Sequence, residues 1–154
     1  MRRITRLAVP VLIGLACSTA RADDAATRLR AARSLRCTFT LDIATWIRSG
    51  HRTVEQTTEK STVDYDNINI AKGTARIVAH GDWGGAGDLT VWMERTGGSL
   101  WLLERAPSGN VITTTVFPMY AEGTAEFVAL ESRHWITGAT VVGQQTYGTC
   151  QVLE

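Results

Sequence analysis

The sequence predicts an all-β protein, a small antiparallel meander that closes into a barrel of about eight strands. Three runs rich in β-branched and aromatic residues, Leu89–Glu94, Leu100–Glu104 and Val111–Phe117, are separated by two spacers of turn-forming residues. Cysteines on the first and last predicted strands favour closure, because a disulfide between them would bring the ends of the sheet together. A two-sheet β-sandwich is the alternative architecture.

The amino-terminal residues have the three-part layout of a secretory signal peptide. A basic segment, Met1–Arg6, precedes an apolar run, Leu7–Ala16, and Ala20-Arg21-Ala22 supplies the small residues that signal peptidase requires. The apolar run has about ten residues, roughly half of what a membrane-spanning helix needs. We therefore expect cleavage before Asp23 and no transmembrane segment in the mature chain.

A lipoprotein that begins at Cys17 is the alternative exported form. Gly14 stands three residues before this cysteine, where a large aliphatic residue is usual, so the sequence favours the cleaved form. Either form predicts a periplasmic or secreted protein.

Size and charge restrict the class of protein further. Removal of residues 1–22 leaves 132 residues, enough for one domain with a modest core and too few for two. The leader also carries four of the 16 basic residues, so 12 basic and 15 acidic residues remain and the formal net charge changes from +1 to −3. The remaining basic residues are scattered, which argues against a nucleic-acid partner.

Cys37 and Cys150 are the two cysteines that follow the leader. In an oxidising compartment such a pair is most simply interpreted as one disulfide. Two reduced, buried thiols are the alternative.

Residues 23–36 are predicted to form an N-terminal arm or a short helix, and residues 37–154 a single barrel domain. One side of such a helix would carry Ala25, Ala26, Leu29 and Ala32. The segment is too short and too weakly apolar to be a stable helix alone. Contact with an anionic lipid or polysaccharide is an alternative role for its four arginines, Arg28, Arg30, Arg33 and Arg36.

The first half of the domain is predicted to contain three strands. Residues 37–44 alternate between apolar and polar side chains, the pattern of a half-buried strand. Thr45–Lys60 is polar and is expected to be a loop or a ragged strand. Val63–Ile70 changes phase, which a bulge near Asp66-Asn67 would explain, and Thr74–His80 follows a short turn.

The second half is predicted to add a glycine-rich loop and two strands to the central meander. The loop, His80–Asp88, has Trp83 at its tip. Thr124–Ser132 and Thr146–Leu153 are predicted strands, joined by an irregular connection over Arg133–Gln145.

The register of the first hairpin in the meander stays open. A two-residue loop would place Met93 opposite Leu102, and a three-residue loop would place it opposite Leu103. Because one slip exchanges the two faces, the sequence does not say whether Trp92 or Trp101 is buried.

No catalytic template, metal site or cofactor site is evident, and we assign no catalytic residue. The three histidines, His51, His80 and His134, are in separate segments without ligand spacing. Two carboxylates among Glu94, Glu104 and Glu126 would have to converge to form a glycosidase-like pair, which spacing alone does not indicate.

The candidate binding residues are Trp83, Arg133, His134 and Trp135. In an extended segment Ser132 and His134 project to one side, and Glu131 and Arg133 to the other. Arg133 would bind an anion or simply pair with a carboxylate. Trp46, Trp83 and Trp135 are expected in loops or at strand ends, where they would form an aromatic rim or fold back as plugs; Trp92 and Trp101 are expected in the core or barrel wall.

Several short motifs carry a resemblance to known proteins. They are Thr113–Phe117, Ser132-Arg133-His134 and Tyr147-Gly148-Thr149-Cys150, within a likeness that spans roughly Thr74 to Cys150. In this order they resemble a group of small exported proteins of proteobacteria that have no assigned activity. The resemblance implies export and a bacterial source, and it implies no substrate or catalytic residue. The general plan is also similar to that of periplasmic lysozyme inhibitors, by analogy alone.

These observations predict a non-enzymatic protein that binds a small ligand or an envelope protein at the barrel mouth. An inhibitor or accessory factor of an envelope enzyme, with the loop around Trp83 inserted into its target, is the first alternative. An enzyme that uses His134 or the strand carboxylates is the second.

Overall fold

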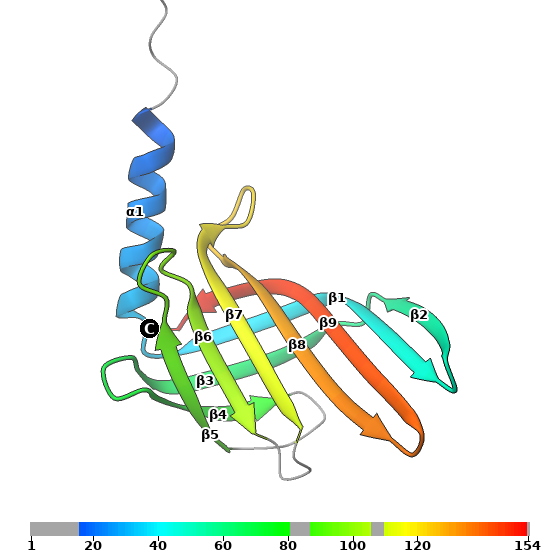
Figure 1. Cartoon of the computed structure of the whole chain (residues 1–154). Coiled ribbons are helices and arrows are strands. Elements are labelled where there is room, and N and C mark those ends of the chain that lie inside the picture. The colour runs from blue at the N-terminus through cyan, green and yellow to red at the C-terminus, as the bar shows by residue number, and fades with distance from the viewer. Residues whose placement is uncertain (1–15, 81–86, 106–109, 154) are drawn as a thin grey trace, which may run out of the picture.

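The computed structural model describes residues 16–80, 87–105 and 110–153 (Figure 1). In these ranges the chain forms one helix and nine strands: α1 (Ala16–Ala31), β1 (Leu35–Arg48), β2 (His51–Thr57), β3 (Ser61–Asn69), β4 (Thr74–His80), β5 (Gly87–Met93), β6 (Leu100–Arg105), β7 (Val111–Tyr120), β8 (Phe127–Thr137) and β9 (Thr140–Val152). All neighbouring strands are antiparallel, in the order β2-β1-β3-β4-β5-β6-β7-β8-β9, and β1 also pairs with β9. Eight strands therefore close a barrel and β2 is added outside it, which confirms the predicted all-β barrel.

The first and last strands close the barrel along their whole length. Leu35 pairs with Val152 at one end of this ladder and Arg48 pairs with Thr140 at the other. Cys37 lies opposite Cys150 and forms a disulfide with it, with 4.0 Å between the two Cα atoms. The predicted disulfide is confirmed.

A bulge divides β1 into two parts. The register with β9 shifts between Phe39 and Leu41, so Thr40 is an extra residue. Gly148 faces Phe39, and a Cβ atom at Gly148 would lie 2.0 Å from the carbonyl oxygen of Thr38. Only glycine allows the two backbones to approach so closely at this bend.

The apolar core fills the end of the barrel that α1 covers, which we call the helix end (Figure 1). Ala25, Leu29 and Ala32 are buried against it, so a short segment that is weak alone is stabilised by tertiary packing. The core side chains from the strands include Leu35, Phe39, Val63, Ile77, Leu100, Val116 and Phe127.

The arginines near α1 make local contacts with the barrel. The Arg28 guanidinium donates to the carbonyl oxygen of Ala125 at 3.3 Å, and that of Arg33 donates to the carbonyl oxygen of Ile68 at 3.4 Å. Arg36 donates twice to the Asp64 carboxylate, at 2.8 and 2.7 Å.

We call the opposite end of the barrel the far end; there residues 42–48 of β1, 131–137 of β8 and 140–146 of β9 extend beyond β3. β3 pairs with β1 up to Phe39, and β2 then pairs with β1 from Asp42 onward. Figure 1 shows these strands and β2 projecting together away from α1.

Of two predictions about the far end, one was correct in one of its two forms and the other was wrong. Thr45–Lys60, expected to be a loop or a ragged strand, is mostly strand, because β1 continues to Arg48 and β2 returns from a two-residue turn at Ser49-Gly50. Arg133–Gln145 is not irregular, because it holds the end of β8 and the start of β9. Apolar alternation depends on one buried face, and all seven residues of β2 are exposed.

Both predicted registers of the first central hairpin were also wrong. Met93 lies opposite Leu100, so residues 94–99 form the connection. The Glu94 N–H donates to the Ser99 carbonyl oxygen at 2.9 Å and closes this longer loop. Trp92 then lies opposite Trp101, and the two rings stack on the outer face with 5.8 Å between their centroids.

The phase change in β3 has the predicted cause. The register with β4 shifts between Asp66 and Asn69, and Asn67 has a φ of 54°. Residues 81–86 of the predicted glycine-rich loop, Trp83 included, lie outside the described residues. Within the described residues, no helix has the length and apolar character needed to cross a membrane.

Candidate functional site

Strand register brings polar residues together on the inner face at the far end. Residues opposite one another in an antiparallel ladder point to the same face. One such row crosses four strands and consists of Thr114, Glu131, Thr146 and Asp42. The next row toward the far end holds Glu104, Ile112, Arg133, Gln144 and Ala44. Both rows are in phase with core residues such as Phe127, so they face the interior.

Glu131 and Arg133 form a largely buried ion pair in these rows. The Glu131 side chain is 1% exposed and that of Arg133 is 18% exposed. Arg133 donates from Nε and lies with Nη2 beside the same carboxylate oxygen, each at 2.6 Å. A charge this deeply buried requires a partner, and Arg133 supplies it.

Tyr65, Glu104 and Thr114 lie beside this ion pair. We call the five side chains the inner polar cluster: Tyr65, Glu104, Thr114, Glu131 and Arg133. The hydroxyl groups of Tyr65 and Thr114 are 2.7 Å apart, and Thr114 donates to Glu131 at 3.4 Å. Burial raises the pKa of Tyr65, and the Glu131 charge raises it further. Burial is also the main cause of a raised pKa at Glu104, where the charge of Glu131 adds to it.

Two buried polar atoms beside this cluster have no hydrogen-bond partner in the described part of the chain. Gln144 donates to Oδ2 of Asp42, but Oδ1 of Asp42 and Nε1 of Trp46 are unpartnered. Trp46 meets Trp135 edge to face, with 6.1 Å between ring centroids. One unpaired acceptor, one unpaired donor and an aromatic pair thus share the inner face of the far end.

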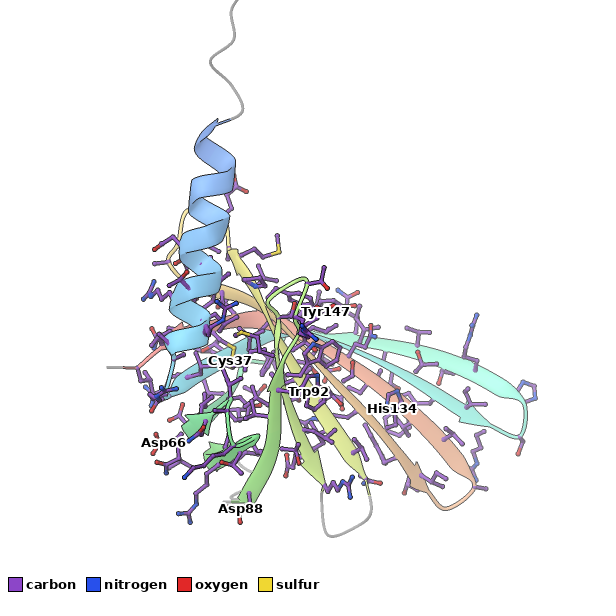
Figure 2. The ribbon with its side chains drawn as sticks, turned by 60° about the vertical axis from the view of Figure 1, so that its left-hand side comes forward. Cys37, Asp66, Asp88, Trp92, His134 and Tyr147 are labelled. Atoms are coloured by element: carbon purple, nitrogen blue, oxygen red, sulfur yellow. A yellow bond between two sulfur atoms is a disulfide. The ribbon has the colours of Figure 1, made fainter. Side chains whose placement is uncertain are left out.

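The structure separates the candidate residues that the sequence indicated. Arg133 and Trp135 lie on the inner face, whereas His134 is exposed on the outer face (Figure 2). Trp83 lies outside the described residues. Trp46 and Trp135 lie within strands rather than in loops, and both Trp92 and Trp101 lie on the outer face.

The carboxylates considered for a glycosidase-like pair do not converge as a set. Glu94 is exposed in the connection after β5, and Glu126 accepts a hydrogen bond from Thr149 near the helix end. Glu104 instead interacts with Glu131. Sequence reasoning placed Glu131 on the same side as Arg133 without selecting it as a candidate, although the phase that it shares with Phe127 and Ala129 was an available signal. It missed Asp42, Tyr65 and Gln144.

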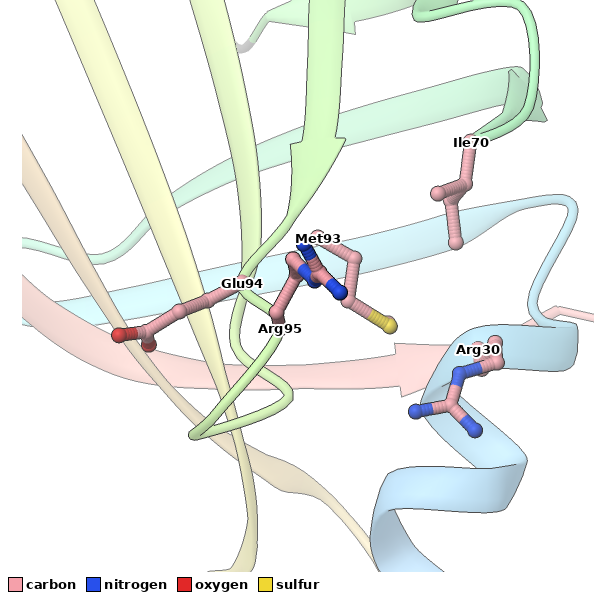
Figure 3. A pocket seen from close by; sticks show the side chains of 5 residues that line it. All are labelled: Arg30, Ile70, Met93, Glu94 and Arg95. Atoms are coloured by element: carbon pink, nitrogen blue, oxygen red, sulfur yellow. The ribbon is translucent and has the colours of Figure 1, made fainter.

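The described residues contain no group of three His, Cys, Asp or Glu side chains placed to hold a metal ion. A separate depression of about 310 Å³ lies at the helix end, lined by Arg30, Ile70, Met93, Glu94 and Arg95 (Figure 3). Its two guanidinium groups are exposed on the surface, so the inner face of the far end is the stronger candidate site.

The fold and this face define a class: a small disulfide-closed β-barrel with an apolar helix end and a polar inner face at the far end. Comparisons with family models, curated proteins and solved structures find no match for this chain.

Proposed function

We propose that this chain is an exported, non-enzymatic binding protein of a bacterial envelope, and that the inner face of the far end is its ligand site. The unpartnered Asp42 Oδ1 and Trp46 Nε1 carry this proposal. Buried polar atoms are nearly always hydrogen-bonded. Oδ1 of Asp42 can therefore accept a hydrogen bond from a ligand or a water molecule, and Nε1 of Trp46 can donate one.

The charges of the face favour a cationic ligand. Glu131 and Arg133 neutralise each other as an ion pair, and the carboxylates of Asp42 and Glu104 remain. The Trp46–Trp135 pair offers aromatic surface of the kind that sugar rings contact. Asp42 and Trp46 are four residues apart on one strand, so their Cα atoms are separated by about 13 Å. This spacing favours an elongated ligand. An amino-sugar disaccharide combines these properties.

Export rests on the predicted leader and on the environment that a disulfide needs. Structural disulfides persist in oxidising compartments, and this chain closes its barrel with one. The buried α1 residues Ala25 and Leu29 follow the predicted cleavage site before Asp23, so cleavage would leave their packing intact. The intact mass of the protein from the envelope distinguishes this form from one lipidated at Cys17.

A paired titration tests the ligand class. The mature protein is titrated by calorimetry with the β-1,4 dimer of glucosamine, and with cellobiose as a neutral probe of the same shape. We expect binding of the amino sugar at least tenfold tighter than that of cellobiose. Asp42→Asn should remove this preference and Trp46→Phe should weaken both probes.

Glu122→Gln, at an exposed carboxylate in the β7–β8 connection, is the control and should bind as the wild type does. Equal affinity for both probes would reject the cationic class. No binding of either probe, with Asp42→Asn and Trp46→Phe changing only stability, would mean that water fills the face and would reject the site.

A second function, inhibitor or accessory factor of an envelope enzyme, is favoured by the outer face. Seven large apolar side chains are exposed there: Ile47, Val54, Trp92, Val111, Ile136, Val141 and Tyr147. Three of them, Ile136, Val141 and Ile47, lie opposite one another on β8, β9 and β1, and a contiguous exposed apolar patch is typical of protein contacts. In that case Ile136→Ser should abolish co-purification of a specific envelope enzyme while Asp42→Asn leaves it unchanged.

A further inference from the structure

One edge of β2 is left open by the part of the chain that the structure describes. In the described ranges it pairs only with β1, from the Asp42–Thr57 pair to the Arg48–His51 pair, without a bulge. All seven of its side chains are exposed, and it contains no proline. Proteins usually protect an edge strand with proline, a bulge, covering structure or charged side chains. Among the described residues β2 has none of the first three, and its charged side chains are Arg52 and Glu55.

The register shows which backbone groups face that edge. In a hairpin with a two-residue turn, the residues that flank the turn exchange both backbone hydrogen bonds, and such pairs alternate along the ladder. Ser49-Gly50 is a turn of this kind, with φ of 49° and 78°. The N–H and C=O groups of His51, Thr53, Glu55 and Thr57 therefore point toward β1, and those of Arg52, Val54 and Gln56 point away from the protein.

A second copy of β2 fits this edge best when Val54 lies opposite Val54 of the partner. Arg52 then lies opposite the partner's Gln56, so three outward-facing residues on each strand give six backbone hydrogen bonds. Thr53 lies opposite the partner's Glu55, and His51 lies diagonally beside that carboxylate. No like charges lie directly opposite each other in this register.

The two neighbouring symmetric registers would be less stable than the one centred on Val54. Centring the pair on Glu55 places two carboxylates directly opposite each other, which is destabilising. Centring it on Thr53 leaves Gln56 beyond the end of the partner's strand and loses hydrogen bonds. The strand is therefore self-complementary in one antiparallel register.

We propose that two copies of this protein associate through antiparallel pairing of their β2 strands about a twofold axis at Val54. Val54 is 60% exposed in the single chain, and in this arrangement its side chain contacts its own copy across the axis. The pairing also joins the outer faces of the two copies, where Ile47 lies diagonally beside Val54 and Val141 lies opposite Ile47 on β9. This proposal is independent of the ligand site.

The oligomeric state of the mature protein tests the pairing. Sedimentation equilibrium over a range of protein concentrations should show a monomer–dimer equilibrium. Val54→Pro removes an outward N–H group and leaves the bonds between β1 and β2 in place, so it should weaken the dimer at least tenfold. Val54→Thr keeps that N–H group and is the matched control, with a much smaller effect expected.

Cross-linking tests the register. Val54→Cys should give a disulfide-linked dimer under mild oxidation, because the two Cα atoms would lie about 5.5 Å apart. Val78→Cys, at a β4 position that is 54% exposed, is the control and should cross-link only at the background rate.

A monomer at all concentrations would overturn the proposal. A dimer that Val54→Pro leaves unchanged, or equal cross-linking of both cysteine variants, would also overturn it and would place the interface elsewhere, such as on the outer apolar face. Circular dichroism of Val54→Pro checks that the barrel is intact.

Discussion

The two ends of the barrel differ in what their inner faces hold, although the same strands build both. At the helix end β1 contributes Leu35, Cys37 and Phe39, each fully buried. Beyond the bulge at Thr40 the same face of β1 contributes Asp42 and Trp46, and Oδ1 of Asp42 and Nε1 of Trp46 have no partner in the described chain.

Along β1 and β8, the residues that stabilise the barrel lie at the helix end and the residues of the candidate site lie at the far end. β8 changes in the same way, from Phe127 and Ala129 to Glu131 and Arg133. The helix end holds the apolar core, the disulfide and α1, and these contacts stabilise the barrel. The far end can therefore carry buried charge, which a small domain tolerates only when enough apolar surface is buried elsewhere.

Removal of the disulfide should cause the largest loss of unfolding free energy. Cys37 and Cys150 are 113 residues apart, and loop entropy predicts that the Cys37→Ala/Cys150→Ala variant loses about 4–5 kcal/mol of unfolding free energy. Chemical denaturation of the oxidised wild type and the variant measures it. A loss well below 1 kcal/mol would show that the helix end does not depend on covalent closure.

Breaking the Glu131–Arg133 ion pair at the far end should cause the next largest loss of unfolding free energy. Glu131→Ala leaves the Arg133 charge without its buried partner, and we expect a loss of about 3 kcal/mol. The Glu131→Leu/Arg133→Met variant removes both charges and should recover most of that loss. Urea denaturation of this double variant and of the single variants Glu131→Leu and Arg133→Met completes a double-mutant cycle that measures the coupling, and additive losses would contradict a paired role.

Glu104→Gln should increase stability by about 0.5 kcal/mol at pH 7, the size of a solvent-screened charge interaction. The pKa of Glu104 is raised in the folded state, mainly by burial. The folded protein therefore holds this proton more tightly than the unfolded chain, and stability falls as the pH rises through the folded pKa. The gain from Glu104→Gln should vanish below about pH 4.5, the ordinary value. Thermal melts from pH 3 to 8 measure it.

The smallest effect is expected for Asp64→Asn near the helix end. The hydrogen bonds from Arg36 lower the pKa of Asp64, so the stabilisation is present above about pH 3.8 and is lost as the pH falls through the lower folded value. The melting temperatures of the variant and the wild type should differ slightly at pH 7 and converge in acid, once the pH is below the lowered pKa of folded Asp64. A difference that persists in acid would indicate a packing effect.

The helix end was largely predictable from local pattern. Alternation over residues 37–44 correctly indicated a strand, but the bulge at Thr40 reverses its phase, so Cys37 and Phe39 face the core whereas Leu41 and Ile43 face outward. The phase change near Asp66-Asn67 located an irregularity that β3 contains. The position of two cysteines at the ends of the sheet indicated closure. Each of these signals arises because one face of the strand is buried in an apolar core.

The far end was not predictable in the same way. β2 has no buried face, so its sequence looks like a loop. The inner face of the extended β8 and β9 strands is polar, which weakens the alternation that identifies strands. Arg133 and Trp135 were selected from sequence, but their neighbours Asp42 and Gln144 come from strands about 100 residues apart, and only pairing brings them together.

The sequence by itself determined the class of this fold, the closing disulfide and the position of most strands, because alternation and turn residues act over a few neighbouring positions. The tertiary structure alone decided the register of the first central hairpin, the length of the far end and the composition of the inner polar cluster. Those features depend on which residues lie opposite one another across strands, and a shift of one position would exchange the two faces of the sheet.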